Sequence, residues 1–172
     1  MPELIAPTVR LHTPWLQAHA EWGPGLHEDG FGLRTSDEVH SAPGFAAWLA
    51  RLTEASDRTT TYRWIVEADQ VLGGIVLRHG PADYVRWAGH VGYGVRPSAR
   101  RRGIATWALG TMLKLAREQG MSHLLVVCAA DNSASARTIE HNGGTLEGIQ
   151  NTEFGPARRY WITLGPVTAE DG

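Results

Sequence analysis

The sequence of 172 residues contains one cysteine, Cys128, and one lysine, Lys114. A single cysteine excludes an intramolecular disulfide and a cysteine-based zinc cluster. No apolar run approaches the roughly 20 residues that a membrane-spanning helix needs. The N-terminal segment also lacks the basic start and apolar stretch of a secretory signal peptide. These absences predict a cytoplasmic protein with no membrane partner and no metal site.

The remaining composition is typical of a soluble globular protein, with 42% hydrophobic and 20% charged residues. The length predicts one domain over residues 1–172. Residues 1–60 contain eight acidic residues and four arginines, a balance of −4, so residues 61–172 carry +2 of the total of −2. A cationic ligand would suit the first part and an anionic one the second. Ordinary scatter of surface charge explains this difference equally well.

Hydrophobic periodicity and turn residues predict an α/β protein of the α+β type, with a mixed, mostly antiparallel seven-stranded sheet and about four helices. The expected strands occupy residues 8–12, 61–68, 71–78, 87–97, 123–128, 145–149 and 158–164. The expected helices occupy residues 14–22, 45–52, 103–119 and 133–142. The second to fourth strands should form an antiparallel meander, with a hairpin turn at Asp69 and Gln70. The helix over 103–119 must cross over to a parallel strand at 123–128.

The most informative segment is "RRRGIAT" at residues 100–106, between an expected strand and an expected helix. The first N–H groups of a helix have no intrahelical partners, and the helix dipole adds positive charge there. Glycine lets a ligand approach the backbone closely. The segment therefore indicates an anion site at a helix start. It is neither a P-loop nor a dinucleotide fingerprint, because the residues of those motifs are missing.

Here the sequence resembles the GNAT superfamily of acyl-CoA-dependent N-acyltransferases. The family motif [Q/R]-x-x-G-x-[G/A] reads Arg100-Arg101-Arg102-Gly103-Ile104-Ala105, and "DNSASARTIEHNGG" at 131–144 resembles the family's N-x-x-[S/A] helix. The resemblance implies one N-acetyltransferase domain whose fourth and fifth strands splay apart around the pantetheine arm of acetyl-CoA. It also implies that residues 61–164 bind this co-substrate and residues 1–60 face the amine acceptor.

The resemblance further implies which residues contact the co-substrate. They are Val95, Arg100, Arg101, Arg102, Gly103, Ile104, Ala105, Thr106, Asn132 and Ser135. The N–H groups of residues 101–106 would hold the diphosphate, and the N–H of Val95 would polarise the thioester carbonyl. Asn132 would bond the arm, cap its helix, or do both.

Direct attack requires a neutral amine, so a base must take a proton, and an acid can protonate the departing thiolate. Family members often carry a glutamate where this chain has His90, which is therefore a candidate base, although a structural histidine is the alternative. The family's usual tyrosine acid is replaced by Ile139, which leaves Ser135 or an ordered water. Cys128 lies in an apolar strand and is more typical of core than of a nucleophile.

The acceptor is left open by the sequence. Tyr93, Glu28 and Asp29 are the candidates for its pocket, and the two carboxylates would attract a cationic amine, whereas tryptophans of residues 14–56 could pack an apolar group. The missing tyrosine acid makes a catalytically silent acyl-CoA-binding regulatory module the alternative function. Nucleic-acid binding is disfavoured because the chain is acidic overall. A homodimer is compatible with the sequence.

Overall fold

The computed structural model describes residues 1–23, 30–56, 59–80 and 83–166. Its strands are β1 (Glu3–Ile5), β2 (Thr60–Glu67), β3 (Gln70–Arg78), β4 (Val91–Val95), β5 (His123–Ala129), β6 (Thr145–Thr152) and β7 (Gly155–Thr163). Its α-helices are α1 (His12–Trp22), α2 (Ala42–Ser56), α3 (Asp83–Ala88), α4 (Ile104–Glu118) and α5 (Ser133–His141).

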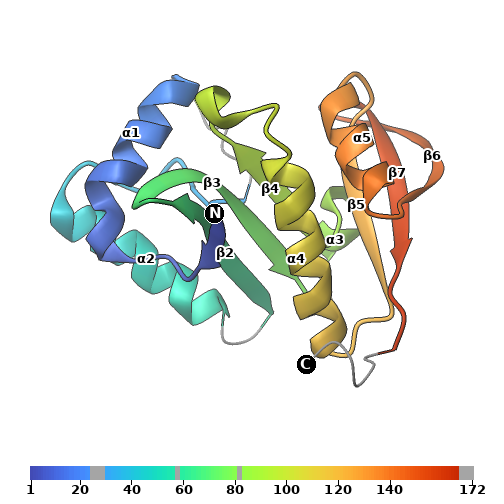
Figure 1. The fold of residues 1–172 in the computed structure, drawn as a ribbon, viewed down its shortest axis with the longest axis horizontal. Helices are drawn as coiled ribbons and strands as arrows, with labels where there is room; N and C mark the ends of the chain where they lie inside the picture. The colour runs from blue at the N-terminus through green and yellow to red at the C-terminus, as the bar shows by residue number, and fades with distance from the viewer. Residues whose placement is uncertain (24–29, 57–58, 81–82, 167–172) are drawn as a thin grey trace.

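The seven strands form one sheet in the order β1-β2-β3-β4-β5-β7-β6 (Figure 1). Neighbouring strands are antiparallel except β4 and β5, which are parallel. β4 and β5 align at one position, Val91 with Val126, whereas β5 and β7 align over seven. The sheet is therefore open between β4 and β5 beyond Val91. This confirms the predicted mixed sheet and its splayed central strands.

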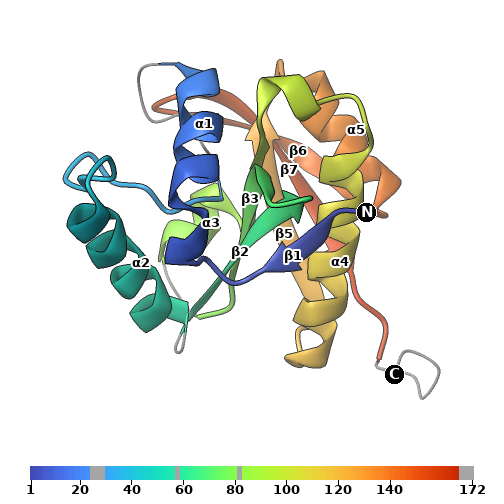
Figure 2. The ribbon, with the colours of Figure 1, turned by 60° about the vertical axis from the view of Figure 1, so that its left-hand side comes forward.

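The helices divide between the two faces of the sheet (Figure 2). α4 and α5 cover one face, and α1, α2 and α3 lie on the other. Side chains of successive strand residues point to opposite faces. In β2, Ile65 accordingly packs under α4, while its neighbours Trp64 and Val66 pack under α1 and α2. The sheet thus separates two hydrophobic cores.

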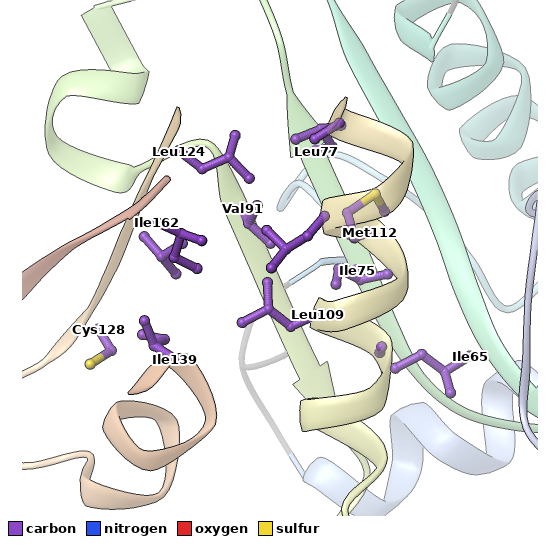
Figure 3. Packing of buried hydrophobic residues seen from close by; sticks show 14 of the residues in the cluster. Ile65, Ile75, Leu77, Val91, Leu109, Met112, Leu124, Cys128, Ile139 and Ile162 are labelled. Carbon is purple, nitrogen blue, oxygen red and sulfur yellow. The ribbon is translucent and has the colours of Figure 1, made fainter. Parts of the chain in front are cut away.

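The core under α4 and α5 is mainly aliphatic (Figure 3). Leu109 and Met112 of α4 are fully buried, and the labelled side chains from β3, β4 and β5 face them. Apolar residues of α4 recur every three or four positions, the spacing that places them on one face of a helix. Cys128 and Ile139 belong to the same core, as the sequence predicts for Cys128.

The core under α1 and α2 is aromatic. Trp15, Phe31, Phe45, Trp48 and Trp64 are at most 2% exposed and contact one another through their rings. Rings of Trp15 and Trp48 lie 4.7 Å apart between centroids. Trp15 and Trp48 of the N-terminal helices are therefore core residues, whereas Trp22 at the end of α1 is only partly buried and lines a cleft between β4 and β5.

The start of the chain differs from the sequence prediction. The strand expected at residues 8–12 was wrong, because Val9–Leu11 form a 3-10 turn that leads into α1. Thr8 accepts a hydrogen bond from the N–H of Arg10 and so begins this turn. The first strand is instead Glu3–Ile5, which pairs with β2. A β-branched run followed by polar residues does not distinguish these two placements locally.

Two further predicted boundaries were wrong. The strand expected at 87–97 is confined to Val91–Val95, and its first residues belong to α3, a fifth helix that the sequence did not indicate. Tyrosine, valine and tryptophan favour strands, but packing of Val85 against the sheet overrides that preference. The hairpin turn lies at Ala68 and Asp69, both with positive φ, rather than at Asp69 and Gln70.

Candidate active site

A cleft of about 1020 Å³ opens between the splayed strands β4 and β5. Its walls come from both faces of the sheet, because the first turn of α4 and part of α5 line one end and α3 and the β6–β7 turn line the other. Every residue predicted to contact the co-substrate lines this cleft except Arg102. The open sheet thus brings together residues 95–106 and 132–135, which are distant in sequence.

The free edge of β4 presents main-chain groups to this cleft. The N–H of Arg78 donates to the carbonyl of His90 and that of Arg96 donates to Leu72, both at 2.7 Å. Between these bonds, the β3–β4 register is regular, so the even-numbered residues of β4 bond to β3. The main-chain groups of Tyr93 and Val95 therefore point toward β5, where no strand pairs with them. The carbonyl of Val95 accepts Nε of Arg100 at 2.9 Å, which leaves its N–H for a ligand.

The turn before α4 has the backbone of an anion site. Gly103 is the N-cap residue with φ of 74°, and Arg101 also has a positive φ of 63°. A Cβ at Gly103 would meet no atom within 4 Å, so the space beside it is open. The N–H groups of Ile104 to Thr106 have no carbonyl four residues earlier within the helix. The predicted glycine turn at the start of a helix is present and lines the cleft, and anion binding there stays a prediction.

The three consecutive arginines have three different surroundings. Arg101 lines the cleft and is exposed. Arg100 also lines the cleft, and its Nε donates a hydrogen bond to the main-chain carbonyl of Val95. Arg102 donates from Nη2 to Oε2 of Glu67 at 2.7 Å, and this hydrogen bond lowers the pKa of Glu67. The predicted contact of Arg102 with a co-substrate stays a prediction, and this ion pair competes with it.

Glu21 holds the segment between β4 and α4 in place, which the sequence did not indicate. This carboxylate of α1 accepts Nε of Arg96 at 2.5 Å and the hydroxyl of Ser98 at 2.9 Å, and it also accepts the N–H of Ser98. Burial opposes ionisation, but hydrogen bonds from Ser98 and Arg96 outweigh it and lower the pKa of Glu21. An acidic residue 77 positions away in sequence gives no local signal of this contact.

Four side chains meet where the cleft narrows between β4, β5 and α5. Asn132 caps α5 by accepting the N–H of Ser135 at 3.1 Å. The hydroxyl of Ser135 lies 2.7 Å from the hydroxyl of Tyr93 and contacts the thiol of Cys128. Burial raises the pKa of Cys128, so the thiol is protonated at neutral pH. Tyr93 packs against the core under α4, so its hydroxyl reaches Ser135 from the opposite strand.

His90 lies beside the cleft and is not among the described residues that line it. Its Nδ1 accepts the N–H of Leu125 at 2.8 Å, which requires an unprotonated Nδ1. Burial lowers the pKa of His90. The ring thus links β4 to β5 at the closed end of the splay, and only Nε2 is left to accept a proton. Its predicted role as a base stays a prediction.

The end of the cleft that α3 and the β6–β7 turn line is aromatic and cationic over the described residues. Tyr84 and Trp87 of α3 and Phe154 of the β6–β7 turn line it, together with Arg78. Sequence reasoning missed these aromatic residues because only Trp87 was assigned to an element, the strand predicted over 87–97, and no element was predicted at Tyr84 or Phe154. A large aromatic residue within a turn, Phe154, was the one sequence feature that could have indicated an exposed aromatic side chain here. Glu28 and Asp29, predicted for this pocket, lie outside the described residues.

The described helices include none that is long and apolar enough to span a membrane. Within residues 1–23, 30–56, 59–80 and 83–166, no three His, Cys, Asp or Glu side chains gather into a metal-binding group.

A splayed mixed sheet with an anion-binding turn at its parallel crossover defines the class of acyl-CoA-dependent acyltransferase folds. The model of the acetyltransferase (GNAT) domain matches residues 13–145. The chain therefore belongs to the GNAT acetyltransferase family. No curated protein sequence matches it.

Solved structures share the fold at low sequence identity. RimL, a ribosomal L7/L12 alpha-N-protein acetyltransferase in complex with coenzyme A, matches with a TM-score of 0.75 and 18% identity over 95% of this chain and 94% of that chain. The microcin C7 self-immunity acetyltransferase MccE, in complex with acetyl-CoA and AMP, matches with a TM-score of 0.72 and 15% identity over 95% and 92%. Mycobacterium smegmatis RimJ, in complex with CoA-disulfide, matches with a TM-score of 0.72 and 18% identity over 94% and 81%.

Proposed function

We propose that this chain transfers an acetyl group from acetyl-CoA to a primary amine by direct attack. The observation that carries the proposal is the β4–β5 splay, whose cleft ends at the positive-φ turn before α4. Structures of the same fold are complexes with coenzyme A or acetyl-CoA, which supports this co-substrate.

The free edge of β4 and the start of α4 divide the recognition of acetyl-CoA. The N–H groups of residues 101–106 and the side chain of Arg101 would bind the diphosphate, which is supported by the position of these residues, except Arg102, in the cleft lining. The pantetheine amides would pair with the main chain of Tyr93 and Val95 as an added strand does. The N–H of Val95 then donates to the thioester carbonyl, where negative charge develops. Asn132, already a helix cap, offers its amide N–H₂ to the arm.

Ser135 and Tyr93 would supply the proton for the leaving group. The amine nitrogen forms a bond to the carbonyl carbon as the C–S bond breaks, and the electron pair of that bond stays on sulfur. The nitrogen loses its surplus proton to a base, for which Nε2 of His90, reached directly or through a water, is the candidate, and exchange with solvent returns a proton to Tyr93 after each turnover. Ser135 gives this thiolate its hydroxyl proton and takes one from Tyr93 at 2.7 Å. An alkyl alcohol alone is a poor acid, whereas a phenol is acidic enough to replace the proton. A tyrosine from β4 thus substitutes for the one that Ile139 displaces from α5.

Thiol release from acetyl-CoA over a panel of primary amines and peptides tests this proposal. We expect release that depends on both acetyl-CoA and an amine, with an N-acetylated product of matching mass. Tight acetyl-CoA binding without turnover on any amine would favour the catalytically silent regulatory module. Because RimL is a ribosomal alpha-N-protein acetyltransferase and the MccE complex contains AMP, the panel includes peptides with free N-termini and small amines with and without a nucleotide group.

A further inference from the structure

The end of the cleft that α3 and the β6–β7 turn line is where the acceptor of the proposed reaction would enter. It exposes three aromatic side chains, which we call the aromatic platform: Tyr84, Trp87 and Phe154. They are 46%, 43% and 80% exposed, although large aromatic side chains are usually buried. Tyr84 and Trp87 come from α3, and Phe154 comes from a turn between two strands on the far side of the splay. Two separate segments therefore bring their rings to one wall of the cleft.

The rings are spaced for a flat group. Trp87 and Phe154 are inclined by 28°, with centroids 6.4 Å apart. Stacked carbon atoms touch at about 3.5 Å, so a ring held between two others needs about 7 Å between them. A small movement of the highly exposed Phe154 provides that space. The ring of Tyr84 packs edge to face against the indole of Trp87, with 4.6 Å between the ring centroids, and so helps to hold the indole in position.

The charge of the cleft restricts which flat group can enter. Its described lining contains no carboxylate, and of its four arginines only Arg78 lies beside the aromatic platform, because Arg100 and Arg101 belong to the turn before α4 and Arg137 belongs to α5. Arg78 lies 4.8 Å from the ring centroid of Tyr84 and donates to the carbonyl of Gly89 at 3.2 Å. A polycationic acceptor would be repelled there, while an aromatic group without further positive charge would not.

We infer that the aromatic platform binds a planar aromatic group of the acceptor, so that the substrate is a primary amine carrying an uncharged or anionic aromatic ring. This inference rests on the proposed acetyl transfer. The ring stacks against Trp87 and Phe154, and the attached amine reaches into the cleft toward the thioester. The aromatic platform would then select the acceptor without contacting the bonds that change.

The test compares 2-phenylethylamine with 2-cyclohexylethylamine, which has the same chain and charge but a non-planar ring. Spermidine is the polycationic probe. We expect kcat/KM to be highest for the aromatic amine and lowest for spermidine, with thiol release as the readout. The Trp87→Ala and Phe154→Ala variants should each lower kcat/KM for the aromatic amine about tenfold, the value of a lost aromatic pair. Both should leave the KM for acetyl-CoA unchanged.

Ile149→Ala is the matched control, because Ile149 is 60% exposed on β6 and does not line the cleft. It should not change the preference. Equal turnover of the phenyl and cyclohexyl amines would overturn the inference, and so would a preference for spermidine. If analytical ultracentrifugation showed that Trp87→Ala converts a dimer of this chain into monomers, the exposed rings would be a contact between two copies and the inference would also fail. Turnover of non-aromatic amines alone would leave acetyl transfer intact and reject the platform. If no amine reacts, quenching of tryptophan fluorescence by 2-phenylethylamine in the wild type but not in Trp87→Ala still supports it, and no such difference rejects it.

Discussion

The hydrophobic cores on the two faces of the sheet are built from different kinds of side chain. Under α4 and α5 the core is aliphatic, and the sheet beside it opens into the cleft. Under α1 and α2 the core is rich in tryptophan and phenylalanine, and the strands it covers, β2 and β3, pair from end to end with one register shift between Ile65 and Val66. Aliphatic side chains leave no polar atom to satisfy. The indole Nε1 atoms of Trp15, Trp48 and Trp64, by contrast, have no hydrogen-bond partner among the described residues.

On the face covered by α4 and α5, an aliphatic core lies beside an edge of β4 that does not pair with β5 beyond Val91. The aromatic half fills a large volume but includes buried donors, each of which lowers stability by about 1–3 kcal/mol. Helix α4 links the core to the cleft directly, because one of its faces is buried and its first turn lines the cleft. Four predictions, from the largest expected effect to the smallest, test this contrast.

Truncation in the two cores should have unequal costs. Leu109→Ala removes a fully buried side chain of α4 and should lower the free energy of unfolding by about 2–5 kcal/mol. Trp48→Phe loses packing too, but it also removes an unpaired buried N–H, so we expect a loss below about 2 kcal/mol. Urea denaturation of both variants measures the difference. A larger loss for Trp48→Phe would show that its Nε1 is satisfied in solution.

Removing the proposed proton donors should affect turnover and not binding. Ser135→Ala should lower kcat about 100-fold, the lower range for a general acid. Tyr93→Phe keeps Ser135 but removes its proton source, so a reduction of about tenfold is expected. Steady-state kinetics should show an unchanged KM for acetyl-CoA in both. Ser133→Ala, an exposed hydroxyl on the same helix outside the cleft lining, is the control. Comparable kcat values in all three variants would remove Ser135 and Tyr93 from the mechanism.

The two ends of α4 offer a matched pair for the anion site. Gly103 before the helix and Gly120 after it have φ of 74° and 84°, and both face open space. Valine at either position adds a left-handed strain of about 1–2 kcal/mol. Only Gly103→Val also obstructs the approach of a diphosphate, so its Kd for acetyl-CoA should rise about tenfold. Calorimetric titration separates the two, and equal affinities would place the diphosphate elsewhere.

The smallest effect concerns the closed end of the splay. Because burial lowers the pKa of His90 in the folded state, the unfolded chain binds a proton there first as the pH falls. Stability from this group is therefore complete above about pH 6.5 and decreases below it. His90→Gln should weaken that acid dependence in denaturation curves recorded between about pH 5 and pH 8.

The same variant tests the base role. If His90 accepts the amine proton, His90→Gln lowers kcat at neutral pH, and turnover recovers at higher pH as the amine deprotonates itself. A pH–rate profile parallel to the wild type would leave His90 with the structural link to Leu125 alone.

Local patterns predicted much of the fold and part of the site. The run "HLLVVC" predicted a buried central strand, and "RRRGIAT" predicted a glycine turn at the start of a helix, because both depend on neighbouring residues. Anion binding at that turn stays a prediction. The helix α3 was missed because its strand-favouring residues are helical only through packing. The different surroundings of Arg100, Arg101 and Arg102 could not be predicted either, because Glu67, which forms an ion pair with Arg102, lies 35 residues away in sequence.

What the sequence alone determined is the set of elements with strong periodicity and the turn whose glycine permits a left-handed backbone. These are properties of contiguous residues. The tertiary structure decided which side chains meet across the open sheet: Tyr93 with Ser135, Glu21 with Arg96, and Trp87 with Phe154. Each of these pairs joins segments brought together by strand order and helix packing, and no local pattern encodes such distances.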